Sequence, residues 1–169
     1  GIFAVNAVQG TLRNLGSTLL GQASADARSG SFLLDVESIG AYATINDPLQ
    51  SGGFFNARNL RVRTGAVTID GTSRAREFTL SADAGAITVA GDGIMQINAG
   101  QAAGDLFQIN GNITGSGSGV LFLRGNGEMI LNGVINAPNV QLAKTEASLL
   151  ILNSTGNNTF SGDILRTGG

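Results

Sequence analysis

Residues 58–71, RNLRVRTGAVTIDG, and residues 76–91, REFTLSADAGAITVAG, decide the fold of this chain. In both stretches apolar residues alternate with polar ones, which is the period of a β-strand, and both contain Gly-rich turn signals. The two stretches also resemble each other, so we interpret them as successive copies of one structural unit. Their alignment pairs four apolar positions 18 or 20 residues apart: Leu60 with Phe78, Val62 with Leu80, Val67 with Ile87, and Ile69 with Val89.

The same period appears later in the chain, where Leu121 and Leu123 align with Val140 and Leu142 at a spacing of 19 residues. One such unit has an apolar row that it cannot bury alone, whereas stacked units cover one another and build a continuous core. The sequence therefore predicts an all-β fold, a right-handed parallel β-helix (β-solenoid), over residues 31–169. Asparagines are expected to form ladders between the turns. A β-sandwich also has short strands with turn signals and remains the alternative.

Residues 1–30 differ from this pattern, and we assign them to an N-terminal cap or extended arm. Ile2 to Val5 are typical of a strand, whereas Leu12, Leu15 and Leu19 have helical spacing. Residues 94–118 fit the period poorly, and the glycine–serine run at 115–119 predicts a turn or a protruding loop.

Composition excludes several classes of function. The 169 residues contain no Cys and no His, which removes thiolate chemistry, the commonest general base and the commonest zinc ligands. Net charge is −2 and the ten cations are scattered, which argues against a nucleic-acid partner. No apolar run is long enough to span a membrane. We therefore expect no enzyme activity, no cofactor and no metal.

Acidic residues are the first candidates for a site. Asp70, Asp83 and Asp92 lie near the ends of adjacent units, where paired carboxylates supply the acid and base of β-helix hydrolases. Asp70 and Asp92 each precede Gly, however, which is the ordinary pattern of a turn. Gly91–Gly93 and Gly125–Glu128 are only weak echoes of a calcium-binding repeat.

Cations, aromatics and sequons give further candidates. Arg61 and Arg63 alternate with core residues, so they should point outward, to bind acidic polysaccharide or to pair with Glu77 and Asp83. The complete cluster is Arg58, Arg61, Arg63, Arg74 and Arg76. The aromatic residues near a loop, which a sugar-binding platform would need, are Tyr42, Phe54 and Phe55. The sequons begin at Asn112, Asn153 and Asn157.

The C-terminal segment carries a family resemblance. Residues 149–153, LLILN, followed by residues 156–164, GNNTFSGDI, resemble the autotransporter-associated β-strand repeat. Residues 52–135 are similar, more diffusely, to filamentous-haemagglutinin-type exoproteins. The resemblance implies bacterial secretion, a right-handed parallel β-helix and no catalytic residues. The secreted passenger domains of autotransporters are usually far longer than this chain. We therefore expect the chain to be a fragment, or a small protein that reuses the repeat.

We therefore expect an extracellular structural protein at the bacterial cell surface, a subunit of a fibre or filament or an adhesin stalk. A solenoid has open strand edges at its ends, and these favour a homo-oligomer or a head-to-tail filament. Surface glycans are a second class of partner. The alternatives are a carbohydrate-binding module and a β-helix polysaccharide lyase or hydrolase. The residues assigned to assembly are Ile2, Phe3, Val5, Ile164 and Leu165.

Overall fold

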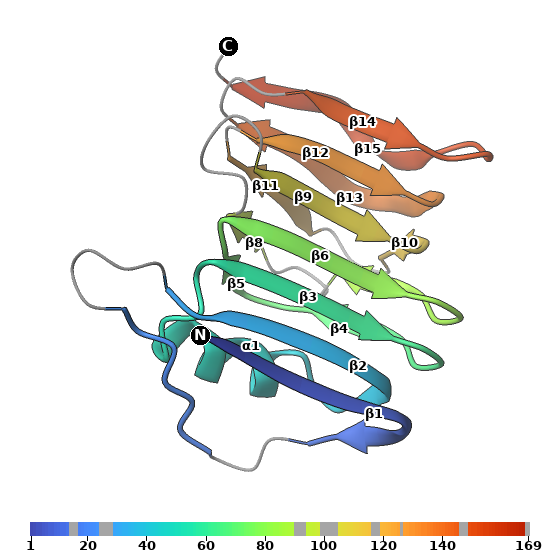
Figure 1. Cartoon of the computed structure of the whole chain (residues 1–169). Coiled ribbons are helices and arrows are strands. Elements are labelled where there is room, and N and C mark those ends of the chain that lie inside the picture. Colours follow the sequence, from blue (N-terminus) through green and yellow to red (C-terminus); the bar gives the residue numbers. More distant parts are fainter. Residues whose placement is uncertain are drawn as a thin grey trace.

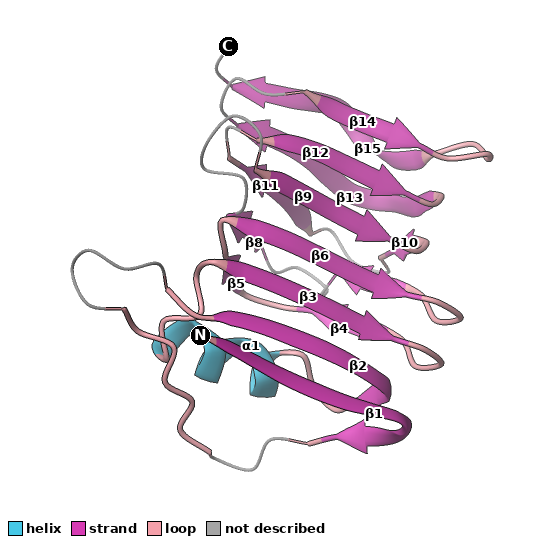
Figure 2. Cartoon of the chain, in the orientation of Figure 1, coloured by secondary structure: helices cyan, strands magenta, loops and turns pink. Residues whose placement is uncertain are grey.

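A computed structural model shows a stack of parallel strands with one short helix near the N-terminus (Figures 1 and 2). It describes residues 1–13, 17–23, 29–89, 94–98, 105–115, 119–125, 127–145 and 149–167. Every strand pair in this part of the chain is parallel, and the strands form a β-solenoid of about five turns. The predicted fold class is confirmed, since a β-sandwich would be built from antiparallel pairs.

Seven strands form the first face of the solenoid. In spatial order they are β1 (Ile2–Leu12), β2 (Ser31–Ile39), β3 (Ala57–Val62), β6 (Glu77–Ala82), β9 (Leu106–Asn110), β12 (Glu128–Asn132) and β14 (Leu150–Asn153). In Figure 1 these strands run to the right in front, and the chain returns behind them while climbing. The winding is therefore right-handed, as expected for parallel crossovers.

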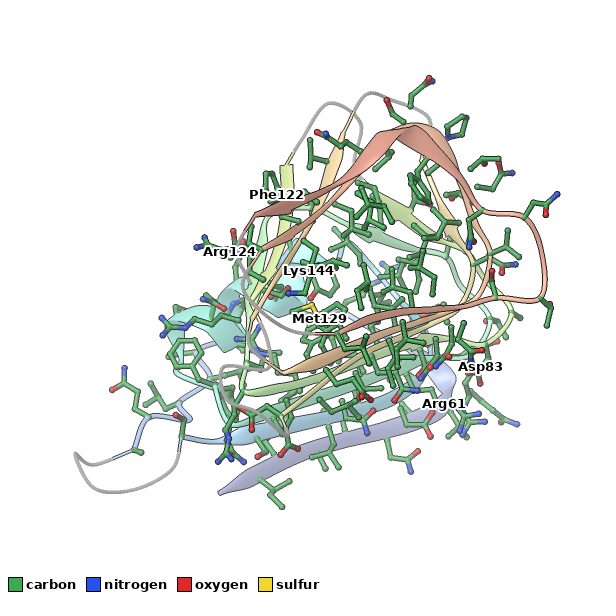
Figure 3. All side chains as sticks on the ribbon, turned by 90° about the horizontal axis from the view of Figure 1, so that it is seen from above. Arg61, Asp83, Phe122, Arg124, Met129 and Lys144 are labelled. Atoms are coloured by element: carbon green, nitrogen blue, oxygen red, sulfur yellow. The ribbon has the colours of Figure 1, made fainter. Side chains whose placement is uncertain are left out.

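The other strands form the second and third faces. They are β4 (Val67–Ile69), β5 (Thr72–Arg74), β7 (Ile87–Val89), β8 (Ile94–Asn98), β10 (Ile113–Thr114), β11 (Val120–Arg124), β13 (Ile135–Thr145) and β15 (Thr159–Thr167). The start of β13 pairs with β10 and its end pairs with β11, so this long strand turns the corner between the two faces. Viewed along the axis, the three faces surround one interior filled with side chains (Figure 3).

In-register columns of apolar side chains build the core. On the first face one column continues through every coil: Val5, Leu34, Leu60, Leu80, Ile109, Leu131 and Leu152. Its five central members are at most 3% exposed, and each fully buried side chain of this size stabilises the fold by about 1.5–3 kcal/mol. The corner between the first two faces is closely packed at Gly133, where an added Cβ would overlap the Gly111 carbonyl. Gly133 also has φ 134°, a conformation that favours glycine.

Two predicted registers are wrong by two residues. Leu60 lies opposite Leu80 rather than Phe78, and Val62 opposite Ala82. Leu121 lies opposite Leu142 rather than Val140, and Leu123 opposite Lys144. The prediction failed because Arg58 and Lys144 occupy inward positions, which an alignment of apolar residues skips. The other predicted pairs, Val67 with Ile87 and Ile69 with Val89, are confirmed.

The N-terminal region contributes a strand and is followed by a helix. Ile2 to Val5 belong to β1, as the strand-like pattern predicted, and β1 pairs with β2. The helical spacing from Leu12 to Leu19 yields no helix among the described residues: Leu12 ends β1, and residues 17–23 are irregular. A helix that was not predicted, α1 (Ala43–Ser51), follows β2 and lies behind β1 and β2 (Figure 1). In the 94–118 segment, residues 94–98 form β8 and residues 106–110 form β9, whereas 116–118 lie outside the described residues.

Candidate functional site: the open strand edges

The lower edge of the first face is strand β1. It pairs with β2 on one side and is the terminal strand of its sheet on the other. The ring of Phe3 stacks on Phe32 at a centroid distance of 5.7 Å but remains 44% exposed, and Val5 is only half-buried. Ile2 is 74% exposed. These three predicted assembly residues thus lie on an edge strand with incompletely covered apolar side chains.

Backbone groups of β1 face this edge in a fixed alternation. The Gly1 carbonyl accepts a hydrogen bond from the Ser31 N–H at 2.9 Å, so the Gly1 groups point toward β2. Because backbone groups of successive strand residues point to opposite sides, those of Ile2, Ala4 and Asn6 point away from β2. The lower edge therefore offers a row of donors and acceptors.

The upper edge of the first face is strand β14. Leu150 and Leu152 continue the inward columns but are only half-buried, unlike Met129 and Leu131 one coil below. The Met129 N–H donates to the Leu149 carbonyl at 3.0 Å, so the backbone groups of Leu150 and Leu152 point to the free edge.

The other predicted upper-end residues lie on β15, which pairs with β13. Ile164 is 39% exposed, and Leu165 lies opposite Ala143 while its side chain is outside the described ones.

A ladder of asparagine side chains rises along the end of the first face. Asn153 donates its amide to Asn132 Oδ1 at 2.8 Å, Asn132 to Asn110 Oδ1 at 2.8 Å, and Asn110 to Ser81 Oγ at 2.9 Å. The predicted asparagine ladder is confirmed. Its direction is uniform, because every amide donates to the coil before it. Asn6 occupies the same register position at the lower edge, where it is exposed.

Sequence reasoning assigned neither Asn6 nor Asn153 to the assembly edge. The available signal was the repeated Asn-Gly pair at 110–111 and 132–133, which marks one corner of successive coils.

A buried polar cluster fixes α1 against the first face. Arg58 is 1% exposed and points inward, where its guanidinium donates to three neutral acceptors. They are Phe54 O at 2.9 Å, Asn46 Oδ1 at 2.9 Å and Gln50 Oε1 at 3.1 Å. Ser73 Oγ also donates to Asn46 Oδ1, at 2.8 Å, and bonds to the Tyr42 hydroxyl. Every buried side-chain nitrogen or oxygen in the described residues has a hydrogen-bond partner.

Burial shifts the titration of two members of this cluster in opposite directions. It lowers the pKa of Arg58 to about 10, because desolvation disfavours the guanidinium cation. It raises the pKa of Tyr42 to about 12, because desolvation disfavours the phenolate more than the Ser73 hydrogen bond stabilises it. The cluster is a structural anchor for α1, and all five of its side chains are engaged within the fold.

A second buried cation lies at the other end of the solenoid. Lys144 is 3% exposed and points into the interior (Figure 3), where its ammonium donates to the carbonyls of Gly125, at 3.3 Å, and Thr145.

Ion pairs engage the outward arginines. Arg61 contacts Asp83 at 2.7 Å on the outer surface (Figure 3), as predicted, and Arg63 contacts Asp35 at 2.7 Å. The hydrogen bond from Arg63 holds the pKa of Asp35 below its ordinary value. The buried position of Arg58 corrects its place in the predicted surface cluster. Arg76 contacts Asp105 at 2.8 Å, and Arg74 lies 5.5 Å from the Phe55 ring centroid.

The two acidic candidates within the described residues, Asp70 and Asp83, lie at a turn and in an ion pair. Asp70 precedes Gly71, which has φ 78°, so the predicted turn is confirmed there. Asp83 follows β6 and is paired with Arg61. Asp92 and residues 91–93 lie outside the described residues, as does Asn126 of the 125–128 segment. No group of three acidic, His or Cys side chains positioned for a metal ion occurs in the part that the structure describes.

Two of the three candidate sugar-platform aromatics are buried, which corrects their expected exposure. Tyr42 is 2% exposed and Phe54 4%, because both pack into the core with α1. Of the sequon asparagines, Asn112 accepts the Val134 N–H at 3.0 Å, Asn153 belongs to the ladder, and Asn157 is exposed.

Comparisons with known proteins do not assign this chain to a family. No family model, no curated protein and no solved structure matches this chain. Among the described residues, no helix has the length and apolar character needed to cross a membrane. The parallel strand pairing shows a β-solenoid with repeat-like turns. The resemblance to autotransporter and filamentous-haemagglutinin repeats stays a prediction.

Proposed function

We propose that this chain is an extracellular structural protein, a subunit of a surface fibre or of an adhesin stalk. In this proposal coil stacking supplies the rigid rod, and the open strand edges supply the contacts between subunits. Location at the bacterial cell surface rests on the sequence resemblance described above. The observation that carries the proposal is that, in the part of the chain that the structure describes, no strand pairs with the outer edge of β1 or of β14, and both strands have incompletely covered apolar side chains.

Open parallel edges are a physical reason for assembly. An unpaired edge offers backbone groups to any strand that reaches it, and proteins that stay monomeric cover or charge such edges. The exposed large apolar residues include several at the ends: Ile2, Phe3, Val8, Leu149 and Ile164. A contact between the lower end of one copy and the upper end of another is head-to-tail, and its repetition gives an open filament.

Sedimentation velocity and electron microscopy of the purified chain over a range of concentrations test this function. We expect the mean mass to rise with concentration and rods one solenoid wide to appear. The matched variant is Ala4→Pro, which removes an N–H that points to the free edge and leaves the hydrogen bonds to β2 in place. It should keep the circular dichroism spectrum and thermal midpoint of the parent chain but remain monomeric. A parent chain that is monomeric at every concentration contradicts the proposal.

A further inference from the structure

We propose that the occupant of the β14 edge is β1 of a second copy of this chain, bound as a parallel strand in one defined register. This inference rests on the proposed function and adds the partner and its alignment. The predicted pairs are Leu150 with Phe3, Ile151 with Ala4, Leu152 with Val5, and Asn153 with Asn6 of the incoming copy.

The inward columns continue across this junction. Phe3 and Leu150 are the first and last members of one column in the first face, and Val5 and Leu152 are the first and last members of the next. All four are less covered than the members between them, because each lacks a neighbour on one side. Placing β1 on β14 supplies that missing neighbour with a side chain of the kind already stacked inside the chain.

Backbone hydrogen bonding is also compatible with this register. Leu150 and Leu152 direct their backbone groups upward, and Ile2, Ala4 and Asn6 direct theirs downward, as shown by the bonds at Leu149 and Gly1. In a parallel pair, a residue that faces its partner strand bonds to the two residues flanking its opposite number. Leu150 opposite Phe3 would therefore bond to Ile2 and Ala4, whose groups are turned toward it.

The asparagine ladder selects this register from its neighbours. Slips of two residues preserve the backbone match but place Ala4 or Val8 opposite Asn153. Only the proposed register brings Asn6 to this position, one coil beyond Asn153. Because each ladder amide donates to the coil before it, the Asn6 amide would donate to Asn153 Oδ1 and extend the ladder into the next copy. A hydrogen bond of this kind contributes about 0.5–1.5 kcal/mol, which favours the matched register about 2- to 13-fold.

Cysteine cross-linking tests the register, since the chain has no native cysteine. Two single variants, Ala4→Cys and Ile151→Cys, are oxidised separately and as a mixture, and disulfide-linked dimers are measured by non-reducing electrophoresis and mass spectrometry. Opposite residues on neighbouring strands lie about 5 Å apart, within disulfide range. We expect a dimer in the mixture and none in either variant alone.

A matched control replaces Ile151→Cys by Leu149→Cys, which is two residues out of register. Its Cα would lie about 8 Å from that of Ala4, beyond the reach of a disulfide. Equal cross-linking by the control pair overturns the register. Dimers from Ala4→Cys alone or from Ile151→Cys alone overturn it as well, since they indicate pairing of like edges. Rods without any cross-link overturn the register but leave the proposed function standing, whereas a chain that stays monomeric and unlinked overturns both.

Discussion

At the scale of single residues, the most informative positions are two cations inside the solenoid. Arg58 stands between Phe32 and Phe78 in an inward column, where every other member is apolar. A buried charge is costly unless its donors are satisfied, and here neutral groups from α1 and its loop accept them. Arg58 therefore joins the helix to the first face.

The lone tyrosine makes this cluster measurable. In the folded chain Tyr42 should titrate with a pKa of about 12, whereas in concentrated guanidinium chloride it should titrate near its ordinary value of about 10. Because the folded pKa is raised, the stability that Tyr42 contributes is complete below pH 10 and is lost as pH rises toward 12. Phenolate absorbance reports on this residue alone, since the chain has one Tyr and no Trp.

Absorbance is a better readout than the free energy of unfolding. The lowered pKa of Arg58 makes stability rise with pH over the range in which Tyr42 makes it fall. A folded-state midpoint near pH 10 would show that the Tyr42 hydroxyl is accessible to water.

These cations also mark the limit of prediction from sequence at this scale. The strand period identified the apolar positions of β3, β6 and β11 correctly, because alternation follows directly from strand geometry. The register between coils was wrong where Arg58 or Lys144 replaced an apolar residue. Their inward orientation depends on acceptors from elsewhere in the chain, which no local pattern reveals.

At the scale of elements, the asparagine ladder fixes how one coil sits on the next. Each rung links the ends of adjacent strands on the first face through side chains rather than backbone. Apolar columns alone tolerate slips of two residues, since an inward position is then exchanged for another inward position. The ladder removes that freedom because the amides meet only in one alignment.

Asn132→Ala should destabilise the chain by about 1–3 kcal/mol, because it deletes a donor to Asn110 and an acceptor for Asn153. Urea unfolding followed by circular dichroism measures the change. Asn59→Ala is the matched control, since Asn59 is an exposed residue on β3 of the same face and should change stability by less than about 0.5 kcal/mol. Equal effects of the two substitutions would mean that the ladder does not contribute to stability.

At two places near the N-terminus, helical spacing in the sequence did not lead to the correct prediction. Leu12 has helical spacing to Leu15 and Leu19, but it lies opposite Ile39 in the sheet, so strand pairing overrides the local pattern. The signal for α1 was available, because Tyr42, Ile45 and Leu49 recur at helical intervals and all three are buried. Pro48 within the segment obscured it.

At the scale of the whole molecule, the solenoid behaves as a row of coils in which each contacts mainly its neighbours. Removing residues 111–132 would join Asn110 to Gly133. The new junction is again an Asn-Gly pair, as at 110–111 and 132–133 in the parent chain. The deletion removes one complete coil, β10 to β12, and brings Asn153 above Asn110 in the ladder column.

We expect this shortened chain to fold cooperatively with a strand-type circular dichroism spectrum and a lower thermal midpoint. Deleting only residues 111–122 changes the phase of the coil and should abolish cooperative unfolding. Loss of cooperative folding in both deletions would contradict independent stacking of coils.

The candidate site was predictable only in part at this scale. The sequence placed Ile2, Phe3 and Val5 in a strand and the apolar run before Asn153 in another. That β1 and β14 are the two terminal strands of one sheet, with the same column positions, depends on the complete winding of the chain. Asn6 and Asn153 are 147 positions apart, and their equivalence emerges only from the registers of the coils between them.

The position of α1 has a mechanical consequence for a rod built from such subunits. Within a chain, adjacent coils are joined along as many as three faces, but α1 and not a strand follows β2, and no described strand precedes β4 or β5 on the second and third faces. A junction made through β1 therefore carries load along one face only. Under tension or bending such a rod would open at the junctions between subunits, on the side where the helix lies. The rod would therefore bend at intervals of one subunit, while each subunit stays stiff.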